Sequence, residues 1–183
     1  MTCIVGATYG GVVYIGGDSV GVDTSDLAVT IRSDEKVFIN GPCIFGCCGS
    51  FRMNQILRYQ LRVPQKPAKM PTVRYVNTLL IEAIRATLKQ HGCSHVEDNE
   101  EEVPGEFLLG FAGSLYAVEA DYQVGTSYVP YMACGCGAAY ALGAMYTQYA
   151  KLGARLRLRR ALEAAEYFSG AVRRPFTILK LGA

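Results

Sequence analysis

The chain has 183 residues, of which half are hydrophobic and 19% are charged, and its formal net charge is +2. This length and composition are typical of a globular protein that buries one core, so we expect a single domain over residues 1–183. The small net charge gives no reason to expect a nucleic-acid partner, and no apolar run reaches the roughly 18–20 residues that a membrane span needs. The chain also opens without the pattern of a secretory signal. We therefore expect a cytoplasmic protein whose seven cysteines stay reduced.

The start of the chain predicts a β-hairpin. Two β-rich runs, residues 2–8 and 12–17, flank a glycine-rich turn. If the turn is centred near Gly10, paired positions sum to about twenty, as an estimate for a regular ladder. That register places Thr2 directly across from Asp18, so a hydroxyl next to the chain terminus would lie beside a carboxylate.

The first half of the chain continues with strands and then changes to helices. We expect a polar loop with a short strand at 27–31, a strand at 36–39, a tight turn at Asn40-Gly41 and a partner strand at 42–48. Ser50 then fits the N-cap of a helix over 50–61. Three prolines make 63–71 a connector, and Pro71 suits the first turn of a second helix that runs to about Gln90.

In the second half we again expect strands followed by helices, with one further strand at the end. An acidic segment over 91–104 reads as a solvated surface loop. The expected elements after it are strands at 106–111, 114–119 and 124–134, helices at 135–149 and 156–168, and a closing strand at 175–181. Strands in runs and helices in pairs favour an α+β fold with antiparallel sheets over alternating βαβ units. Two sheets packed face to face, with helix pairs outside them, would bury the apolar residues.

An N-terminal threonine can act as a nucleophile with its own α-amine as the base. Thr2 becomes the N-terminal residue if Met1 is removed. Removal of the initiator methionine is favoured when the next residue is small, as Thr2 is. The free α-amine of an N-terminal residue has a pKa near 8, so part of it is neutral near pH 7. That amine can take the proton of its own hydroxyl and so activate it as a nucleophile.

Two further residue types and one turn would support this chemistry. A lysine near the hydroxyl favours the alkoxide, and a carboxylate beside the lysine holds it charged and oriented. Lys36 and Asp18 supply these two types at strand ends. The turn over residues 46–50, at a strand-to-helix junction, offers backbone N–H groups to a developing oxyanion.

The sequence resembles a known family on several motifs. The stretches Thr2-Cys-Ile-Val-Gly6 and Val12-Val-Tyr-Ile-Gly-Gly-Asp-Ser19 are similar to the opening of proteasome β-type subunits and of the bacterial HslV peptidase. Lys36-Val37, the turn at 46–50, and the segments 135–143 and 166–170 match later motifs of those proteins in the same order. Those proteins are N-terminal-nucleophile hydrolases with a four-layer αββα sandwich, in which two antiparallel sheets are flanked by helix pairs.

The resemblance implies a function and a set of site residues. It implies a threonine-type peptidase without a cofactor, which cleaves amide bonds of peptides or unfolded proteins inside a homo-oligomeric ring, with an ATP-dependent unfoldase as a further partner. The implied site residues are, in the catalytic role, Thr2, Asp18, Lys36, the N–H of Ser50, Cys136, Glu166 and Ser169, and, beside the substrate, Gly21, Cys48 and Gly49. Three of them depart from the family pattern: Ser50 replaces a glycine, Cys136 a serine and Glu166 an aspartate. The chain therefore resembles a divergent member.

The same residues allow other interpretations. Cys47-Cys48, Cys93 with His95, and Cys134-x-Cys136 are potential metal ligands, but paired C-x-x-C motifs are absent and there are only two histidines, so we expect no metal. A nucleophilic Cys3 would require the loss of both Met1 and Thr2. An arginine-rich helix over 156–168 also contains glutamates, which favours a solvated or subunit-contact face over nucleic-acid binding.

The alternative function is a proteasome-like fold kept as an inactive structural or assembly protein, which a retained Met1 would favour.

Overall fold

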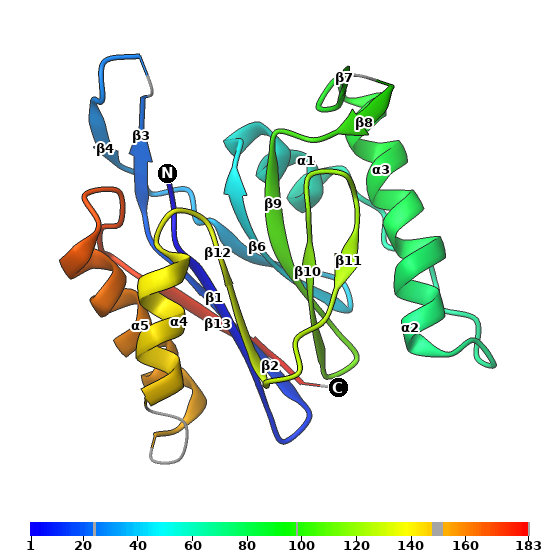
Figure 1. Ribbon diagram of the computed structural model, residues 1–183. Coiled ribbons are helices and arrows are strands. Elements are labelled where there is room, and N and C mark those ends of the chain that lie inside the picture. Colours follow the sequence, from blue (N-terminus) through cyan, green and yellow to red (C-terminus); the bar gives the residue numbers. More distant parts are fainter. Residues whose placement is uncertain (24, 98, 148–151, 183) are drawn as a thin grey trace.

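Two antiparallel sheets form the middle of the molecule in the computed structural model, which describes residues 1–23, 25–97, 99–147 and 152–182 (Figure 1). The first sheet contains, in spatial order, β12 (Tyr131–Cys134), β1 (Ile4–Tyr9), β2 (Val12–Gly17) and β13 (Thr177–Leu181). The second sheet contains β11 (Val124–Gly125), β10 (Ser114–Val118), β9 (Gly105–Phe111), β6 (Cys43–Gly49) and β5 (Val37–Asn40). Two small hairpins lie outside them: β3 (Val20–Val22) with β4 (Val29–Ile31), and β7 (His95–Glu97) with β8 (Glu100–Glu102).

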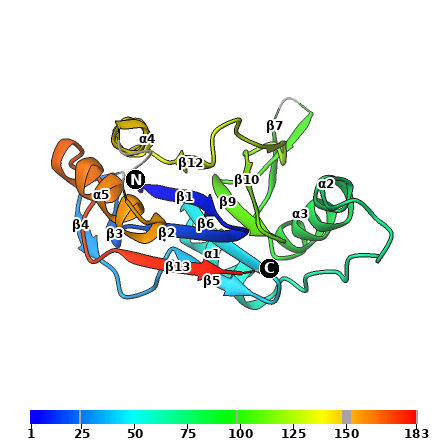
Figure 2. The same ribbon diagram turned by 90° about the horizontal axis from the view of Figure 1, so that it is seen from below.

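Helices cover the outer face of each sheet, which gives four layers (Figures 1 and 2). The first sheet is covered by α4 (Ala138–Thr147) and α5 (Ala154–Phe168). The second is covered by α1 (Phe51–Tyr59) and by a longer helix made of α2 (Thr72–Tyr75), the π-helical turn η1 (Val76–Leu80) and α3 (Ile81–Gln90). The predicted α+β fold, a four-layer αββα sandwich, is confirmed. Within the described residues, no helix has the length and apolarity that crossing a membrane requires.

Three buried apolar clusters separate these layers. One lies under α1 to α3, a second lies under α4 and α5, and the third fills the space between the two sheets. The members of the third cluster come from both sheets: Ile4, Val13, Ile15, Val37, Ile44, Cys48, Leu108, Leu115 and Cys134. Burial of apolar surface on both faces of each sheet therefore holds the sandwich together.

Glycines allow the two sheets to approach closely. A Cβ atom at Gly46 of the second sheet would lie 2.6 Å from side-chain atoms of both Ile4 and Ile15 of the first sheet. A Cβ at Gly110 of the second sheet would lie 2.7 Å from Val13. Real Cβ atoms essentially never come this close to another heavy atom, so the spacing of the sheets depends on these positions having no side chain.

The first hairpin forms as predicted, but its register differs by one residue. Gly10 and Gly11 both have positive φ, +57° and +76°, and they form a two-residue turn whose centre lies between them. Ile4 therefore pairs with Gly17, and paired positions sum to 21. The prediction that Thr2 lies directly across from Asp18 is wrong, because the N–H of Cys3 faces that carboxylate instead.

Three other boundaries differ from the sequence prediction. The strand β3 forms within the expected loop, because it pairs with β4. The acidic segment expected as a plain loop contains the hairpin of β7 and β8. The single strand expected over 124–134 is two strands, β11 and β12, which belong to different sheets. Residues 148 and 149, at the end of the helix expected over 135–149, lie outside the described residues.

Candidate active site

Three side chains meet where the two sheets end together. Thr2 lies two residues before β1, Asp18 directly follows β2, and Lys36 directly precedes β5. The ammonium nitrogen of Lys36 donates to the Thr2 hydroxyl oxygen at 2.8 Å and to an Asp18 carboxylate oxygen at 2.9 Å. Thr2, Asp18 and Lys36 are only 4%, 2% and 3% exposed. The site therefore spans the gap between the sheets, with hydroxyl and carboxylate on the first and ammonium on the second.

The Asp18 carboxylate is held from several sides. One oxygen accepts hydrogen bonds from the Cys3 N–H at 2.9 Å and from Lys36. The other accepts from the N–H of Val20 at 3.0 Å and from the N–H of Arg173 at 3.5 Å. A buried carboxylate needs such partners, because an unpaired one is very costly away from water. Asp18 thus fixes the position of the Lys36 ammonium.

Two opposing effects act on Lys36. Burial lowers the pKa of Lys36 from its ordinary value, because a low-dielectric surrounding disfavours the charged form. The charge and the hydrogen bond of Asp18 act in the opposite direction. The outcome is a lysine with a pKa below 10.5, which lies in contact with the Thr2 hydroxyl.

The backbone of Thr2 is held by the segment that follows β12. Its N–H donates to the Cys136 sulfur at 3.2 Å, and its carbonyl accepts from the Gly137 N–H at 3.2 Å and from the Cys136 thiol at 3.3 Å. The hydroxyl of Thr2 donates to the carbonyl of Met1, which is present in this chain. The structure thus brings Cys136 to Thr2, as the sequence predicted, and in this form the nitrogen of Thr2 is an amide.

Ser50 has a structural contact in place of the predicted one. Its N–H donates to the carbonyl of Pro104 at 2.9 Å, so the prediction that this N–H faces an oxyanion at Thr2 is wrong. Its hydroxyl caps α1 by accepting from the N–H groups of Arg52 and Met53. Successive N–H groups along an antiparallel strand point to opposite sides. The Cys47 N–H donates to the Lys36 carbonyl, so the Gly49 N–H, two residues later, is directed to the same side as Lys36.

A small hollow adjoins the hydroxyl of Thr2. It is lined by Thr2, Lys36, Cys47, Gly49, Ser50, Phe51 and Asn54. Gly21 lies next to it, since a Cβ there would be 3.6 Å from the ring of Phe51. The side chain of Cys48, which the sequence placed beside the substrate, is not among the lining groups. It points between the sheets, because neighbouring side chains of a strand alternate, and Cys47 borders the hollow instead.

Glu166 and Ser169 form hydrogen bonds with residues other than Thr2. The Glu166 carboxylate binds the guanidinium of Arg174 at 2.6 and 2.9 Å and also accepts from its backbone N–H. Ser169 ends α5, and its hydroxyl accepts from the N–H of Ala171. The predicted support of the terminus by Glu166 and Ser169 stays a prediction, since the hydrogen bonds of these side chains among the described residues go to other partners. In Glu166 the carboxylate instead meets a cation on the segment before β13.

The structure makes Cys3 an unsuitable nucleophile. Its side chain is fully buried, and burial, followed by the nearby charge of Asp18, raises the pKa of Cys3 to about 12. Reactive cysteines are exposed and have a lowered pKa. Among the described residues, one group of potential metal ligands comes together instead: Cys48, Glu106 and Cys134.

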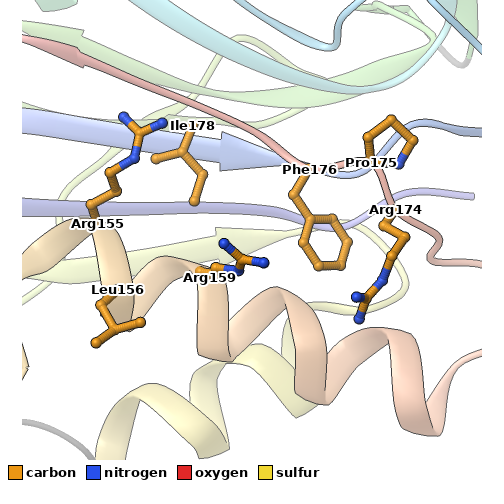
Figure 3. A pocket seen from close by; sticks show the side chains of 7 residues that line it. All are labelled: Arg155, Leu156, Arg159, Arg174, Pro175, Phe176 and Ile178. Carbon is orange, nitrogen blue, oxygen red and sulfur yellow. The ribbon is translucent and has the colours of Figure 1, made fainter.

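A much larger cavity lies elsewhere, on the helical layer outside the first sheet. It has a volume of about 560 Å³ and lies between α5 and the start of β13 (Figure 3). Its lining consists of Arg155, Leu156, Arg159, Arg174, Pro175, Phe176 and Ile178. Thr2, Asp18 and Lys36 are not among the lining residues, so the size of this cavity does not identify it as the substrate site of Thr2.

No family model and no curated protein matches this sequence. Solved structures do match over the whole chain. Thiobacillus denitrificans BPH is 21% identical with a TM-score of 0.80, and the alignment covers 99% of this chain and 98% of that one. The same protein in complex with epoxomicin gives 22% identity, a TM-score of 0.78 and the same coverage. Eukaryotic HslV from Trypanosoma brucei is 18% identical with a TM-score of 0.71, and both chains are fully covered.

At these identities the likeness establishes the fold and not the activity. The TM-scores of 0.71 to 0.80 extend over the full length of this chain and of the solved structures, so the likeness covers the whole sandwich. The chain therefore has the HslV-like, proteasome-type fold.

Proposed function

We propose that this chain is a threonine-type N-terminal-nucleophile amide hydrolase that acts on peptides or unfolded proteins. The observation that carries the proposal is the buried Lys36 ammonium, which joins the Thr2 hydroxyl to the Asp18 carboxylate at 2.8 and 2.9 Å. A hydroxyl paired with a buried cation is poised to ionise, because the cation stabilises the alkoxide. The likeness to a solved structure that contains epoxomicin is consistent with this chemistry.

The acylation step uses Thr2 twice. Once Met1 is removed, the nitrogen of Thr2 is a free α-amine with a pKa near 8. This amine takes the hydroxyl proton as the oxygen attacks the substrate carbonyl, and Lys36 stabilises the negative charge that develops on the nucleophile. The Gly49 N–H, directed to the Lys36 side, donates to the oxyanion. Collapse of the tetrahedral intermediate breaks the amide bond. The α-ammonium group of Thr2 gives its proton to the leaving amine, and the acyl group remains on Thr2 as an ester.

Deacylation repeats the same roles with water. The α-amine of Thr2 takes a proton from a water molecule as it attacks the ester carbonyl, and it gives that proton back to the threonine oxygen as the acid leaves. No metal or cofactor takes part in the steps proposed here. We further propose, from the resemblance alone, that several copies form a ring around these sites and that an ATP-dependent unfoldase supplies substrates.

The decisive experiment combines intact mass with covalent labelling. Protein from its native host, or from a host with methionine aminopeptidase, is expected to have lost Met1. Incubation with a threonine-directed epoxyketone is then expected to add one inhibitor mass per chain, on Thr2. The Thr2→Ala variant is the control: it is expected to fold and should remain unlabelled.

Two results would contradict the proposal. Met1 retained on all chains from the native host would leave Thr2 without the base, and labelling that persists in Thr2→Ala would place the nucleophile elsewhere. A second function, an inactive structural or assembly protein, is favoured by one observation: the Thr2 hydroxyl donates to the carbonyl of Met1, so an unprocessed chain holds its own nucleophile in an internal contact. The same mass measurement separates the two functions.

A further inference from the structure

Two buried thiols and a carboxylate come together between the sheets, behind the segment that holds Thr2. The sulfur of Cys48, on β6, lies 3.4 Å from the sulfur of Cys134, on β12, and 3.5 Å from a carboxylate oxygen of Glu106, on β9. All three potential ligand atoms lie within 4.8 Å of one another. The two cysteines are 5% and 6% exposed. The mechanism proposed for Thr2 uses none of these three side chains.

We propose that Cys48, Cys134 and Glu106 bind one zinc ion, with a water molecule as the fourth ligand. Zinc prefers tetrahedral coordination by thiolate, imidazole and carboxylate, with Zn–S near 2.3 Å and Zn–O near 2.0 Å. In a tetrahedron these lengths place two sulfurs about 3.8 Å apart and a sulfur and an oxygen about 3.5 Å apart. The distances of 3.4 and 3.5 Å agree with these edges to within a few tenths of an ångström.

The charges and the surroundings of the site also fit a cation. Binding displaces one proton from each thiol, so Zn²⁺ meets two thiolates and one carboxylate, and two protons are released to solvent. Among the described residues, no lysine, arginine or histidine forms an ion pair with Glu106. The Gly135 N–H donates to Glu106 at 2.9 Å, which fixes the carboxylate as an outer hydrogen bond does in metal sites. Glu106 is only partly buried, which leaves a route from solvent.

The position of the ion gives it a structural role. Two of the proposed ligands fix the segment Cys134-Gly135. Cys134 would bind the ion directly, and the Gly135 N–H donates to Glu106, which would bind it too. The next residue, Cys136, contacts the backbone of Thr2. An ion here would tie β6 and β9 of the second sheet to β12 of the first and so fix the segment against Thr2. The proposal does not depend on hydrolysis, since an inactive protein with this fold would bind the same ion.

The test measures metal binding by the reduced, purified full chain. Zinc content by elemental analysis is expected to be one ion per chain, and replacement by Co²⁺ is expected to produce thiolate-to-cobalt charge-transfer absorption with the visible bands of tetrahedral cobalt. Cys48→Ser and Cys134→Ser should abolish both signals, and Glu106→Gln should weaken cobalt binding at least about tenfold. Cys43→Ser, on the same strand but in the cluster under the helices, is the matched control and should bind like the wild type.

A second measurement on the wild-type chain avoids variants that fail to fold. Zinc should protect Cys48 and Cys134 from alkylation, as mapped by mass spectrometry, while the exposed Cys136 is alkylated with and without zinc. The proposal is overturned if the reduced wild type binds neither metal, if both serine variants keep the cobalt spectrum, or if Cys48 and Cys134 form a disulfide that zinc does not prevent. None of these outcomes bears on whether Thr2 is labelled.

Discussion

Two ion pairs of this molecule have similar distances and very different surroundings. Lys36 and Asp18 lie 2.9 Å apart with side chains that are 3% and 0% exposed, and the lysine also contacts a hydroxyl. Arg174 and Glu166 lie 2.6 Å apart at the surface, where the arginine side chain is 61% exposed. The sequence assigned Glu166 to the same site as Asp18. The structure gives the two carboxylates different partners, and the comparison shows that pairs with similar contact distances can differ completely in burial and in what else they contact.

The energetic meaning of the two pairs also differs. A buried ion pair contributes through what happens when one partner is removed, because the other charge is then left without compensation. An exposed pair is screened by solvent and contributes little.

Lys36→Met should have the largest effect. The substitution keeps the aliphatic stem, removes the ammonium and leaves the buried Asp18 carboxylate without a cation, which is expected to cost about 3–5 kcal/mol of unfolding free energy. The double variant Asp18→Asn with Lys36→Met should recover a large part of that loss. Urea unfolding of both variants and of Arg174→Met, the matched surface change, measures the contrast. Equal losses in the single and the double variant would show that the buried pair is not coupled.

Ser50→Ala should have an intermediate effect on stability and none on the chemistry. Loss of the hydroxyl that caps α1 is expected to cost about 1 kcal/mol. The backbone N–H of residue 50 still donates to Pro104, and the Gly49 N–H is unchanged. The rate of epoxyketone labelling should therefore equal that of the wild type. A labelling rate that falls tenfold or more would show that the Ser50 hydroxyl contributes to the chemistry at Thr2 and does not only cap α1.

Glu166→Gln should have the smallest effect, and the effect should depend on pH. The hydrogen bonds and the charge of Arg174 lower the pKa of Glu166 from its ordinary value of 4.5. A carboxyl with a lowered pKa stabilises the fold above its unfolded pKa, and this contribution disappears as the pH falls through the folded value. The melting temperature should thus be about 1–3 °C lower than that of the wild type near pH 7 and equal to it in acid. A constant difference at all pH values would assign the effect to packing.

The sequence predicted most of the fold because its signals are local. Alternating apolar residues, the two-glycine turn and the Ser50 cap each act over a few residues, and the structure contains the hairpins and helices that they indicate. The hairpin register was wrong by one because the sequence does not show whether Gly10 alone or Gly10 with Gly11 makes the turn. Local signals of this kind place an element well and its last residue less well.

The site was less predictable because it depends on contacts between layers. Lys36 and Asp18 lie 18 residues apart and meet only because two sheets end at the same place. The partner of Glu166 could not be read from the sequence, since an arginine eight residues later takes the carboxylate. Gly49 could have been preferred to Ser50 from strand alternation alone, if the end of β6 had been known.

The glycines between the sheets have a consequence for evolution and for mutant screens. Thr2 and Asp18 flank strands of one sheet and Lys36 and Gly49 belong to the other, so the distance between the sheets sets the separation of the Thr2 hydroxyl and the Lys36 ammonium. A single methyl group at Gly46 or Gly110 would act as a wedge, since it would meet side chains of the opposite sheet at 2.6 or 2.7 Å. Such a variant could keep its helices and its cores and still lose function. The geometry of the Thr2 site therefore depends on Gly46 and Gly110, which lie away from it, as well as on the residues that contact Thr2.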